Sequence, residues 1–297
     1  MRVGIIASLK YKEEILPTAR KVFKNVVFVP ITDIKIEIGE EINVWYKEKN
    51  LNELDAIIPL PSSHYEFYYT CLKALENRTY IPIPSDKFFM WIKRPVLFNL
   101  LLKNGINVKD LFVISYSSQT EEIIKHLKLP VSITSGRKRI VVNNKETLAS
   151  VLPLFKVGYT LLITKPIIPE ENIFTLLVNK RIVASYDEVN KKSIILDESL
   201  RKIVLKIREV IESDFFVLNL VKYKKKLWVN DISFFLNFST FKKITRKDVL
   251  YALFANLKIR IEEKRKSLLQ EISENLISFF RWMENEVSNL RSIGKRI

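Results

Sequence analysis

The sequence is poor in the residues from which many catalytic and metal sites are built. It contains six glycines in 297 residues, whereas an average composition gives about twenty. A glycine-rich phosphate-binding loop therefore has few residues from which to form. The single cysteine, Cys71, excludes a disulfide framework and a zinc site of several cysteines. His64 and His126 are too far apart in the sequence to form a metal-binding motif.

The chain also lacks a long uninterrupted apolar segment. No window reaches the roughly 18 apolar residues of a transmembrane helix, and the opening MRVGIIASLKYKEE has too short an apolar run for a signal peptide. We therefore expect a cytoplasmic protein that has no membrane partner. Abundant lysine and isoleucine, with little glycine, cysteine or methionine, are typical of a thermophilic, archaeal-like source.

Positive charge is what the chain has in excess. Lysine and arginine number 49 against 33 acidic residues, which gives a net charge of +16. Hydrophobic residues make up 47% of the chain, so a disordered protein is excluded. A folded domain with this charge attracts polyanions, and DNA, RNA or a phosphorylated ligand is the expected partner.

Apolar periodicity predicts an α/β protein. Strands and helices alternate over the first 85 residues, which indicates an open parallel sheet. The expected strands there are residues 2–7, 26–31 and 55–59, and the expected helices are residues 11–24 and 65–76. After the prolines at 82 and 84, one helix is expected over residues 87–102, with Gly105 at its C-terminal end.

Further strands and helices follow up to residue 257, where the pattern changes. The expected strands are residues 111–115, 131–133, 139–142, 160–163, 173–177, 181–185, 215–223 and 226–232. The expected helices are residues 120–126, 145–154 and 200–211, and another helix is expected to start near Thr245. Asn179 and Lys180 are expected to form a hairpin turn.

The last forty residues carry a seven-residue repeat. Its apolar positions are Leu269, Ile272, Leu276, Phe279, Met283, Leu290 and Ile293, with Glu286 as an interruption. This spacing indicates either a long helix packed on its own domain or a dimerising coiled coil, and the sequence leaves both open. The predicted units are residues 1–85, 86–157, 158–257 and the helical tail 258–297.

Three segments of the chain follow the pattern of a known superfamily. The first is SDKFFMWIKRPVLFNLLLKNGI at 85–106, similar to a stretch that opens on Asp-Lys and ends on Gly-Ile. The second is LPVSITSGRKRIVVNNKETL at 129–148, and the third is DFFVLNLVKYKKKLWVNDIS at 214–233. Together these segments resemble the ATP-grasp superfamily, in particular the branch of ribosomal-protein glutamate ligases and lysine-biosynthesis ligases. The resemblance implies a three-lobed α/β architecture with an N-terminal parallel-sheet lobe.

The same resemblance implies a set of nucleotide-binding residues, several of which are missing. ATP-grasp enzymes use two lysines and a mobile glycine-rich loop on the phosphates. Lys87 stands at the first lysine and Thr134 at the second, and the loop shrinks to residues 135–139 with Gly136 as its only glycine. Lys165 stands in the adenine-contacting segment, where the family usually has an acid.

The metal-binding positions of the family are also altered. The Asp-Ile-Arg motif reads Asn172-Ile173-Phe174, the first metal aspartate becomes Asn219, and Glu-x-Asn becomes Asp231-Ile232-Ser233. Asp231 alone keeps a carboxylate and is the one candidate metal ligand, a weak one, because an amide and a hydroxyl are poor Mg²⁺ ligands beside it. The sequence indicates a degenerate ATP-grasp fold without ligase activity, to which no catalytic residue is assigned. The residues that would contact ATP or Mg²⁺ are Lys87, Lys165, Asn219, Asp231 and Ser233.

Three runs of basic residues are candidates for polyanion contact. Two lie on expected β turns, and the third follows Phe241. Each phosphate that they neutralise adds a salt-dependent contribution to binding. The candidate residues are Arg137, Lys138, Arg139, Lys222, Lys224, Lys225, Lys226, Lys242, Lys243, Arg246 and Lys247.

Three functional classes remain open at this stage. The favoured one is a non-catalytic ATP-grasp relative that binds a polyanion. The alternative is an active ATP-dependent carboxylate-amine ligase or small-molecule kinase, in which Lys87, Lys165 and Asp231 hold the phosphates. The third is a scaffold that dimerises through residues 258–297.

Overall fold

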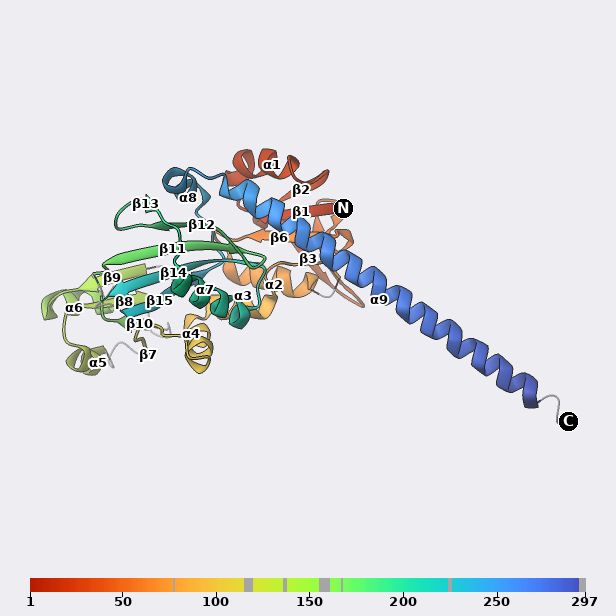
Figure 1. The fold of residues 1–297 in the computed structure, drawn as a ribbon. Helices are drawn as coiled ribbons and strands as arrows, with labels where there is room; N and C mark the ends of the chain where they lie inside the picture. The colour runs from red at the N-terminus through yellow and green to blue at the C-terminus, as the bar shows by residue number, and fades with distance from the viewer. Residues whose placement is uncertain are drawn as a thin grey trace.

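The computed structural model of the chain arranges its strands in four sheets (Figure 1). The structure describes residues 1–76, 78–114, 120–135, 138–154, 161–166, 168–223 and 226–293, with the backbone alone at 120, 121, 127, 135, 138, 280 and 284–293. None of the helices in these ranges has an apolar stretch of the length needed to cross a bilayer.

The N-terminal lobe is built on a parallel sheet, as predicted. Its strand order is β2-β1-β6, and both pairings are parallel. Gly4 of β1 allows close packing, because a Cβ atom there would lie 2.5 Å from Cδ1 of Ile57 and 2.8 Å from Cδ1 of Leu54. The elements are β1 (Arg2–Ala7), α1 (Lys12–Arg20), β2 (Asn25–Pro30), β6 (Ala56–Leu60) and α2 (Tyr65–Leu75).

A second, antiparallel sheet in this lobe was not predicted. It consists of β3 (Ile34–Ile38), β4 (Ile42–Tyr46) and β5 (Lys49–Asn50), in that order. The segment IKIEI of β3 alternates apolar and charged residues, which is the pattern of a strand with one face in solvent. Asn52 closes this sheet from the following turn, where its side chain donates to Ile42 O and accepts from Val44 N.

The single helix expected over residues 87–102 is two helices in the structure. These are α3 (Ser85–Ile92) and α4 (Arg94–Lys103), with a break at Lys93, whose ψ is 67°. Pro95 lies in the first turn of α4, where its missing N–H is tolerated, but it could not lie inside a continuous helix without distortion. Gly105 has a φ of +67°, so the predicted C-terminal cap is confirmed.

The small lobe is an antiparallel sheet with two helices and a core of its own. Its strand order is β7-β10-β8-β9, and its buried residues form a separate apolar cluster. The expected division between residues 157 and 158 assigns β10 to the following unit. In the structure β10 belongs to the small lobe, because it lies between β7 and β8 in the sheet. The elements are β7 (Phe112–Ile114), α5 (Thr120–Leu127), β8 (Val131–Ser135), β9 (Lys138–Val142), α6 (Lys145–Val151) and β10 (Leu161–Thr164).

The largest sheet is antiparallel and has the order β13-β12-β11-β14-β15. Asn179 and Lys180 both have positive φ, so the predicted hairpin turn between β11 and β12 is confirmed. Strand β14 is buried along most of its length, and Asn219 is the polar residue among its buried positions. The elements are β11 (Glu171–Val178), β12 (Arg181–Asp187), β13 (Lys192–Ser193), α7 (Glu198–Ile211), β14 (Phe215–Tyr223) and β15 (Lys226–Ser233).

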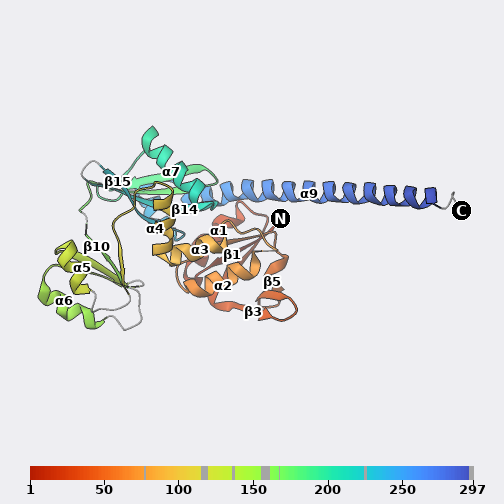
Figure 2. The same cartoon turned by 90° about the horizontal axis from the view of Figure 1, so that it is seen from below.

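Two helices complete the chain. The helix expected to start near Thr245 instead ends there: α8 spans Phe238–Thr245, begins after the Asn237 cap and closes on Arg246 in a left-handed conformation. Helix α9 then runs from Val249 to Ile293, so the expected tail boundary at residue 258 falls inside one helix. Figure 2 shows α9 extending well beyond the rest of the molecule.

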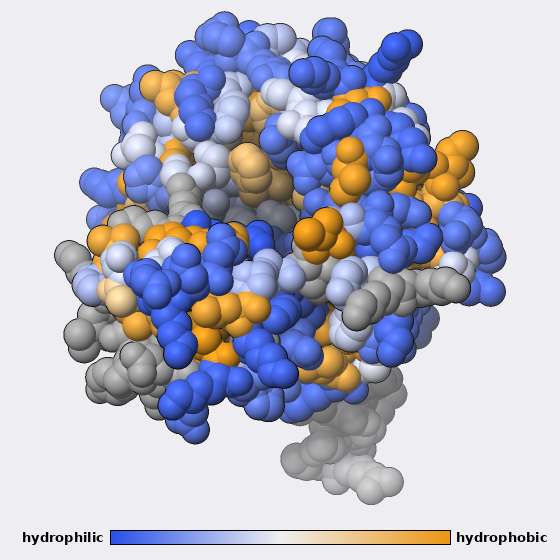
Figure 3. All heavy atoms as spheres, turned by 90° about the vertical axis from the view of Figure 1, so that its left-hand side faces the viewer, coloured by the Kyte–Doolittle hydropathy of each residue, from blue (hydrophilic) through white to orange (hydrophobic). Residues whose placement is uncertain are grey.

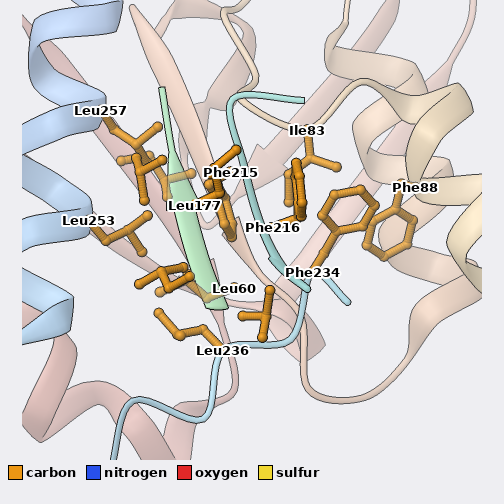
Figure 4. Close-up of a cluster of buried hydrophobic side chains, with 14 of the residues drawn as sticks. Leu60, Ile83, Phe88, Leu177, Phe215, Phe216, Phe234, Leu236, Leu253 and Leu257 are labelled. Atoms are coloured by element: carbon orange, nitrogen blue, oxygen red, sulfur yellow. The ribbon is translucent and has the colours of Figure 1, made fainter. Parts of the chain in front are cut away.

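The N-terminal lobe, the large sheet and the first turns of α9 share one apolar core. In Figure 4, Leu253 and Leu257 of α9 point toward Leu177 of β11. On the other side of this core, the rings of Phe88 and Phe234 are stacked with centroids 6.2 Å apart. The large sheet is therefore fixed to the N-terminal lobe, whereas the small lobe has a separate core.

Candidate functional site

A row of polar side chains crosses one face of the large sheet. Asn219 of β14 lies opposite Asp231 of β15 and opposite Phe174 of β11. The next row contains Asn172 and Trp228, both opposite Val221. Directly paired residues share a face of an antiparallel sheet, so these residues form one surface.

This surface holds most of the unpaired polar atoms of the protein's described interior. Four of the five buried side-chain atoms without a hydrogen bond, among the residues that the structure describes, lie on it. They are Asn172 Oδ1, Asn219 Oδ1, Trp228 Nε1 and Asp231 Oδ1. Buried polar atoms are nearly always paired in folded proteins, so such a cluster indicates a place where a ligand or ordered water binds. We call these four residues the polar cluster.

Arg94 supplies the positive charge beside the polar cluster. Its Nη2 lies 2.8 Å from Oδ2 of Asp231, and the two side chains are 42% and 23% exposed. Burial raises the pKa of Asp231, and the Arg94 charge opposes that rise. The break between α3 and α4 places Arg94 at the start of α4, from which it reaches β15. Sequence reasoning missed this residue, because the only signal was a basic run before a proline.

Lys87 lies elsewhere. Its Nζ is 3.1 Å from Glu212 and 3.3 Å from Asp86. Burial alone would lower the pKa of Lys87, but the hydrogen bond to Glu212 and the Asp86 charge raise it above the usual value. Lys87 borders a small apolar hollow together with Ile232, whose side chain points to the opposite face of β15 from Asp231. The structure therefore does not bring Lys87 and Asp231 together.

The other two candidate cofactor residues make contacts within their own lobes. Lys165 follows β10, and its Nζ donates to the backbone oxygen of Lys128 at 3.0 Å. The Ser233 hydroxyl accepts a hydrogen bond from Phe235 N at 3.0 Å, which closes the turn after β15. Asn219 and Asp231 are thus the two predicted residues that the structure places side by side.

The basic candidates are spread over separate elements. Lys222 of β14 pairs with Glu171 at 3.0 Å, and Lys247 donates to Val183 O. Arg139 of β9 donates from Nε to Ser132 Oγ, and Lys138 begins the same strand. Six have no ion pair among the described residues: Arg139, Lys226, Lys242, Lys243, Arg246 and Lys247. Arg137, Lys224 and Lys225 lie outside the described residues.

These cations do not lie on one patch. Figure 1 places α8, which carries Lys242 and Lys243, apart from the small lobe with Arg139. Figure 3 looks at the end of the molecule on the left of Figure 1 and shows hydrophilic residues over most of that face, with hydrophobic ones scattered between them. The described basic candidates are therefore dispersed over separate elements.

Comparison with solved structures identifies the architecture. A RimK-domain ATP-grasp protein from Sphaerobacter thermophilus superposes with a TM-score of 0.72 at 13% identity, covering 86% of this chain and 98% of that one. The ATP-grasp ligase PsnB, complexed with precursor peptide PsnA2 and AMPPNP, gives a TM-score of 0.67 at 9% identity over 87% and 97% of the two chains. This chain has the ATP-grasp fold.

A further ATP-grasp structure shows the same breadth of agreement. The macrocyclase MdnC from Microcystis aeruginosa MRC, bound with precursor peptide MdnA, has a TM-score of 0.63 at 9% identity over 86% of this chain and 98% of its own. No protein-family model matches the sequence, and no curated protein matches it either. The predicted superfamily resemblance is confirmed at the level of the fold.

The ATP-grasp fold implies Mg²⁺ and ATP, and the polar cluster fits Mg²⁺ poorly. Mg²⁺ prefers an octahedral set of oxygen ligands that includes carboxylates. Here the one carboxylate is bound to the Arg94 guanidinium, its neighbour is an amide, and the Ser233 hydroxyl is engaged in a turn. Among the described residues, no group of three His, Cys, Asp or Glu side chains is arranged to hold a metal.

Proposed function

We propose that this chain is an ATP-grasp-fold protein that has lost ligase chemistry and binds a polyanion. The Arg94–Asp231 ion pair is the observation that carries the first half of the proposal. A guanidinium contacts one oxygen of the only carboxylate in the polar cluster, so a cation of the chain itself already pairs with the one candidate metal ligand. A guanidinium donates hydrogen bonds but has no coordination positions for water or substrate oxygens, so it does not replace Mg²⁺ as a metal centre.

The second half rests on charge. The net charge is +16, and Lys242 and Lys243 of α8 have no ion pair among the residues that the structure describes. Both lie in the last turns of α8. Unpaired surface cations on a strongly basic domain attract phosphate-bearing chains and release counterions on binding.

Titration of a 20-nucleotide single-stranded oligonucleotide at several salt concentrations tests the polyanion half. Binding is expected to weaken linearly in a log–log plot, and K242Q/K243Q is expected to reduce the slope by about 1.4. The matched control K202Q/K206Q removes two lysines from α7, of which Lys202 pairs with Glu198 at 3.8 Å, and should change the slope less. Binding that is absent, or that does not depend on salt, contradicts this half.

An active ligase or kinase is the second candidate, and one observation favours it. Asn219 Oδ1 and Asp231 Oδ1 are both buried, unpaired and on paired positions of neighbouring strands. Two such oxygens can accept hydrogen bonds from a ligand or contribute to a cation site. Release of phosphate from Mg-ATP, measured with and without an acidic peptide, tests this candidate. Turnover that D231N abolishes would support it over the first.

A further inference from the structure

The outer part of α9 projects from the rest of the molecule. Leu253, Leu257 and Ile261 at its base are buried against the body of the protein. Every described side chain from residue 262 to residue 283 is exposed, and Figures 1 and 2 show the helix projecting away from the lobes. The base of the tail therefore packs on its own domain, one of the two alternatives for this segment. The dimerising coiled coil stays a prediction for the exposed remainder.

This projecting helix carries an apolar seam, which Glu286 interrupts at one position. Leu269, Ile272, Leu276, Phe279 and Met283 follow the seven-residue repeat, and each is between 37% and 58% exposed. The sequence continues the repeat through Leu290 to Ile293 near the end of α9. From residue 269 to residue 293 the seam is about 36 Å long.

The period of the seam indicates that its partner is another helix. An α-helix has 3.6 residues per turn, so a strict seven-residue stripe drifts by about 20° per repeat around a straight helix. Only a partner that supercoils with the helix keeps such a stripe covered. A flat sheet or a membrane surface would not require this spacing.

The positions that flank the seam indicate which helix is the partner. In coiled coils these positions commonly carry charges that select one partner and reject others. From residue 268 to residue 290 they are all uncharged: Leu268, Ser273, Asn275, Phe280, Trp282, Val287 and Asn289. Two copies of α9 can therefore meet without charge repulsion between these flanking positions. The flanking positions also carry no charges that would select a different partner. We propose that α9 pairs with α9 of a second copy of this chain.

The same residues favour an antiparallel arrangement. In a parallel pair each seam position faces its own copy, so the two Glu286 carboxylates would meet. An antiparallel pair centred on residue 281 instead sets position 286 opposite Leu276, and Phe279 opposite Met283 of the second copy. A thioether beside an aromatic ring is a favourable contact. The two bodies then lie at opposite ends of the helix pair, where they do not collide.

Molar mass in solution tests the pairing. Light scattering of the full chain after size exclusion, over about 1 to 200 µM, should show a rise from 34.9 kDa toward twice that mass. L276E places a charge in the seam and should leave a monomer at every concentration. The matched control I277E introduces the same charge at the adjacent residue, which is also about half exposed but lies off the seam, and should still dimerise.

Several results would overturn the proposal. A wild-type monomer at all concentrations does so, as does equal loss of the dimer in I277E and L276E. Because every described side chain from residue 262 to residue 283 is exposed, both variants should melt at the wild-type temperature as monomers, which excludes misfolding as the cause. A monomer that binds phosphatidylcholine/phosphatidylserine vesicles through the seam would also contradict pairing.

Cysteine cross-linking tests the orientation. The native Cys71 is buried and does not compete. Under mild oxidation, L269C alone should give no disulfide dimer, because the two thiols lie at opposite ends of an antiparallel seam. The double variant I272C/L290C should cross-link readily between copies. A disulfide dimer formed by L269C alone would show a parallel pair and overturn the antiparallel arrangement.

Discussion

Replacing Arg94 with methionine is expected to destabilise the fold through Asp231 alone. Methionine keeps much of the apolar stem of arginine and removes the charge, so the change isolates the ion pair from the packing around it. The Asp231 carboxylate then has no cation at 2.8 Å, and its Oδ1 is already unpaired. A buried carboxylate without a partner is costly, so the folded state should lose stability at neutral pH.

The size of the loss follows from how exposed the pair is. Breaking a fully buried pair costs about 3–5 kcal/mol, and breaking an exposed pair costs less than about 1 kcal/mol. Asp231 is 23% exposed and Arg94 is 42% exposed, so water reaches both partially. We expect a decrease of about 1–3 kcal/mol in the free energy of unfolding at pH 8. R78M breaks the more exposed pair with Glu41 and serves as the matched control.

The loss should also depend on pH in a defined direction. Burial raises the pKa of Asp231 and Arg94 opposes this, so R94M should raise that pKa further. Between the carboxyl pKa of the unfolded chain and the raised pKa of the folded state, only the folded state holds the proton, and stability falls as pH rises. The deficit of R94M should therefore be small near pH 4 and reach its full size above the folded-state pKa.

Guanidinium chloride unfolding of four proteins at pH 4 and pH 8 measures these effects. They are the wild type, R94M, D231N and R94M/D231N, and a double-mutant cycle gives the coupling free energy. The double variant should recover most of the stability that R94M loses, because the uncompensated carboxylate is gone. A deficit of equal size at both pH values, or one that D231N leaves unchanged, would refute the reasoning.

Two further stability predictions concern other buried charges. Burial and the nearby Arg139 charge lower the pKa of Lys109 to about 8. Between pH 8 and the usual lysine pKa of 10.5, Lys109 therefore stays protonated only in the unfolded chain. The stability of the wild type should rise with pH over this range, by about 3 kcal/mol at most. K109M should be more stable than the wild type at pH 7 and lose that advantage near pH 11, as thermal melting at both pH values will show. D214N should cost about 2–4 kcal/mol in chemical unfolding, because Asp214 accepts hydrogen bonds from Tyr80 and from Arg260 Nε at 3.2 Å and lies 3.9 Å from Arg208. A loss in D214N no larger than that in R78M would contradict this account of Asp214.

Local patterns in the sequence were enough to predict most of the strands and helices. The buried run at residues 2–7 and the turn residues Asn179 and Lys180 each determine nearby backbone through their own chemistry. The alternation in IKIEI was a signal of the same kind and was overlooked. The break before Pro95 could also have been read from the sequence, since proline is a poor residue inside a helix but a good one in its first turn.

The candidate site depends on contacts that no local pattern contains. Arg94 and Asp231 are 137 residues apart, and their pairing follows from how α4 meets the edge of the large sheet. The sequence predicted the hairpin of β14 and β15 but not the pairing of Asn219 with Asp231. The register shift between Asn219 and Leu220 sets Asn219 opposite Asp231, where a regular hairpin would set it opposite Asn230. The ion pair between Lys87 and Glu212 could not be predicted from a local pattern either. Lys87 stands at the expected position in the sequence, but its acidic partner comes from the end of another helix.

The melting temperature with and without Mg-ATP tests the central claim most directly. A working site with a Kd of about 0.1 mM would add about 2 kcal/mol at 5 mM Mg-ATP, which raises the melting temperature by several degrees. For a site in which Arg94 stands beside Asp231, we predict no shift that requires Mg²⁺. A clear upward shift that needs both Mg²⁺ and ATP, and that D231N removes, would contradict the account and show that the polar cluster still holds a metal–nucleotide complex.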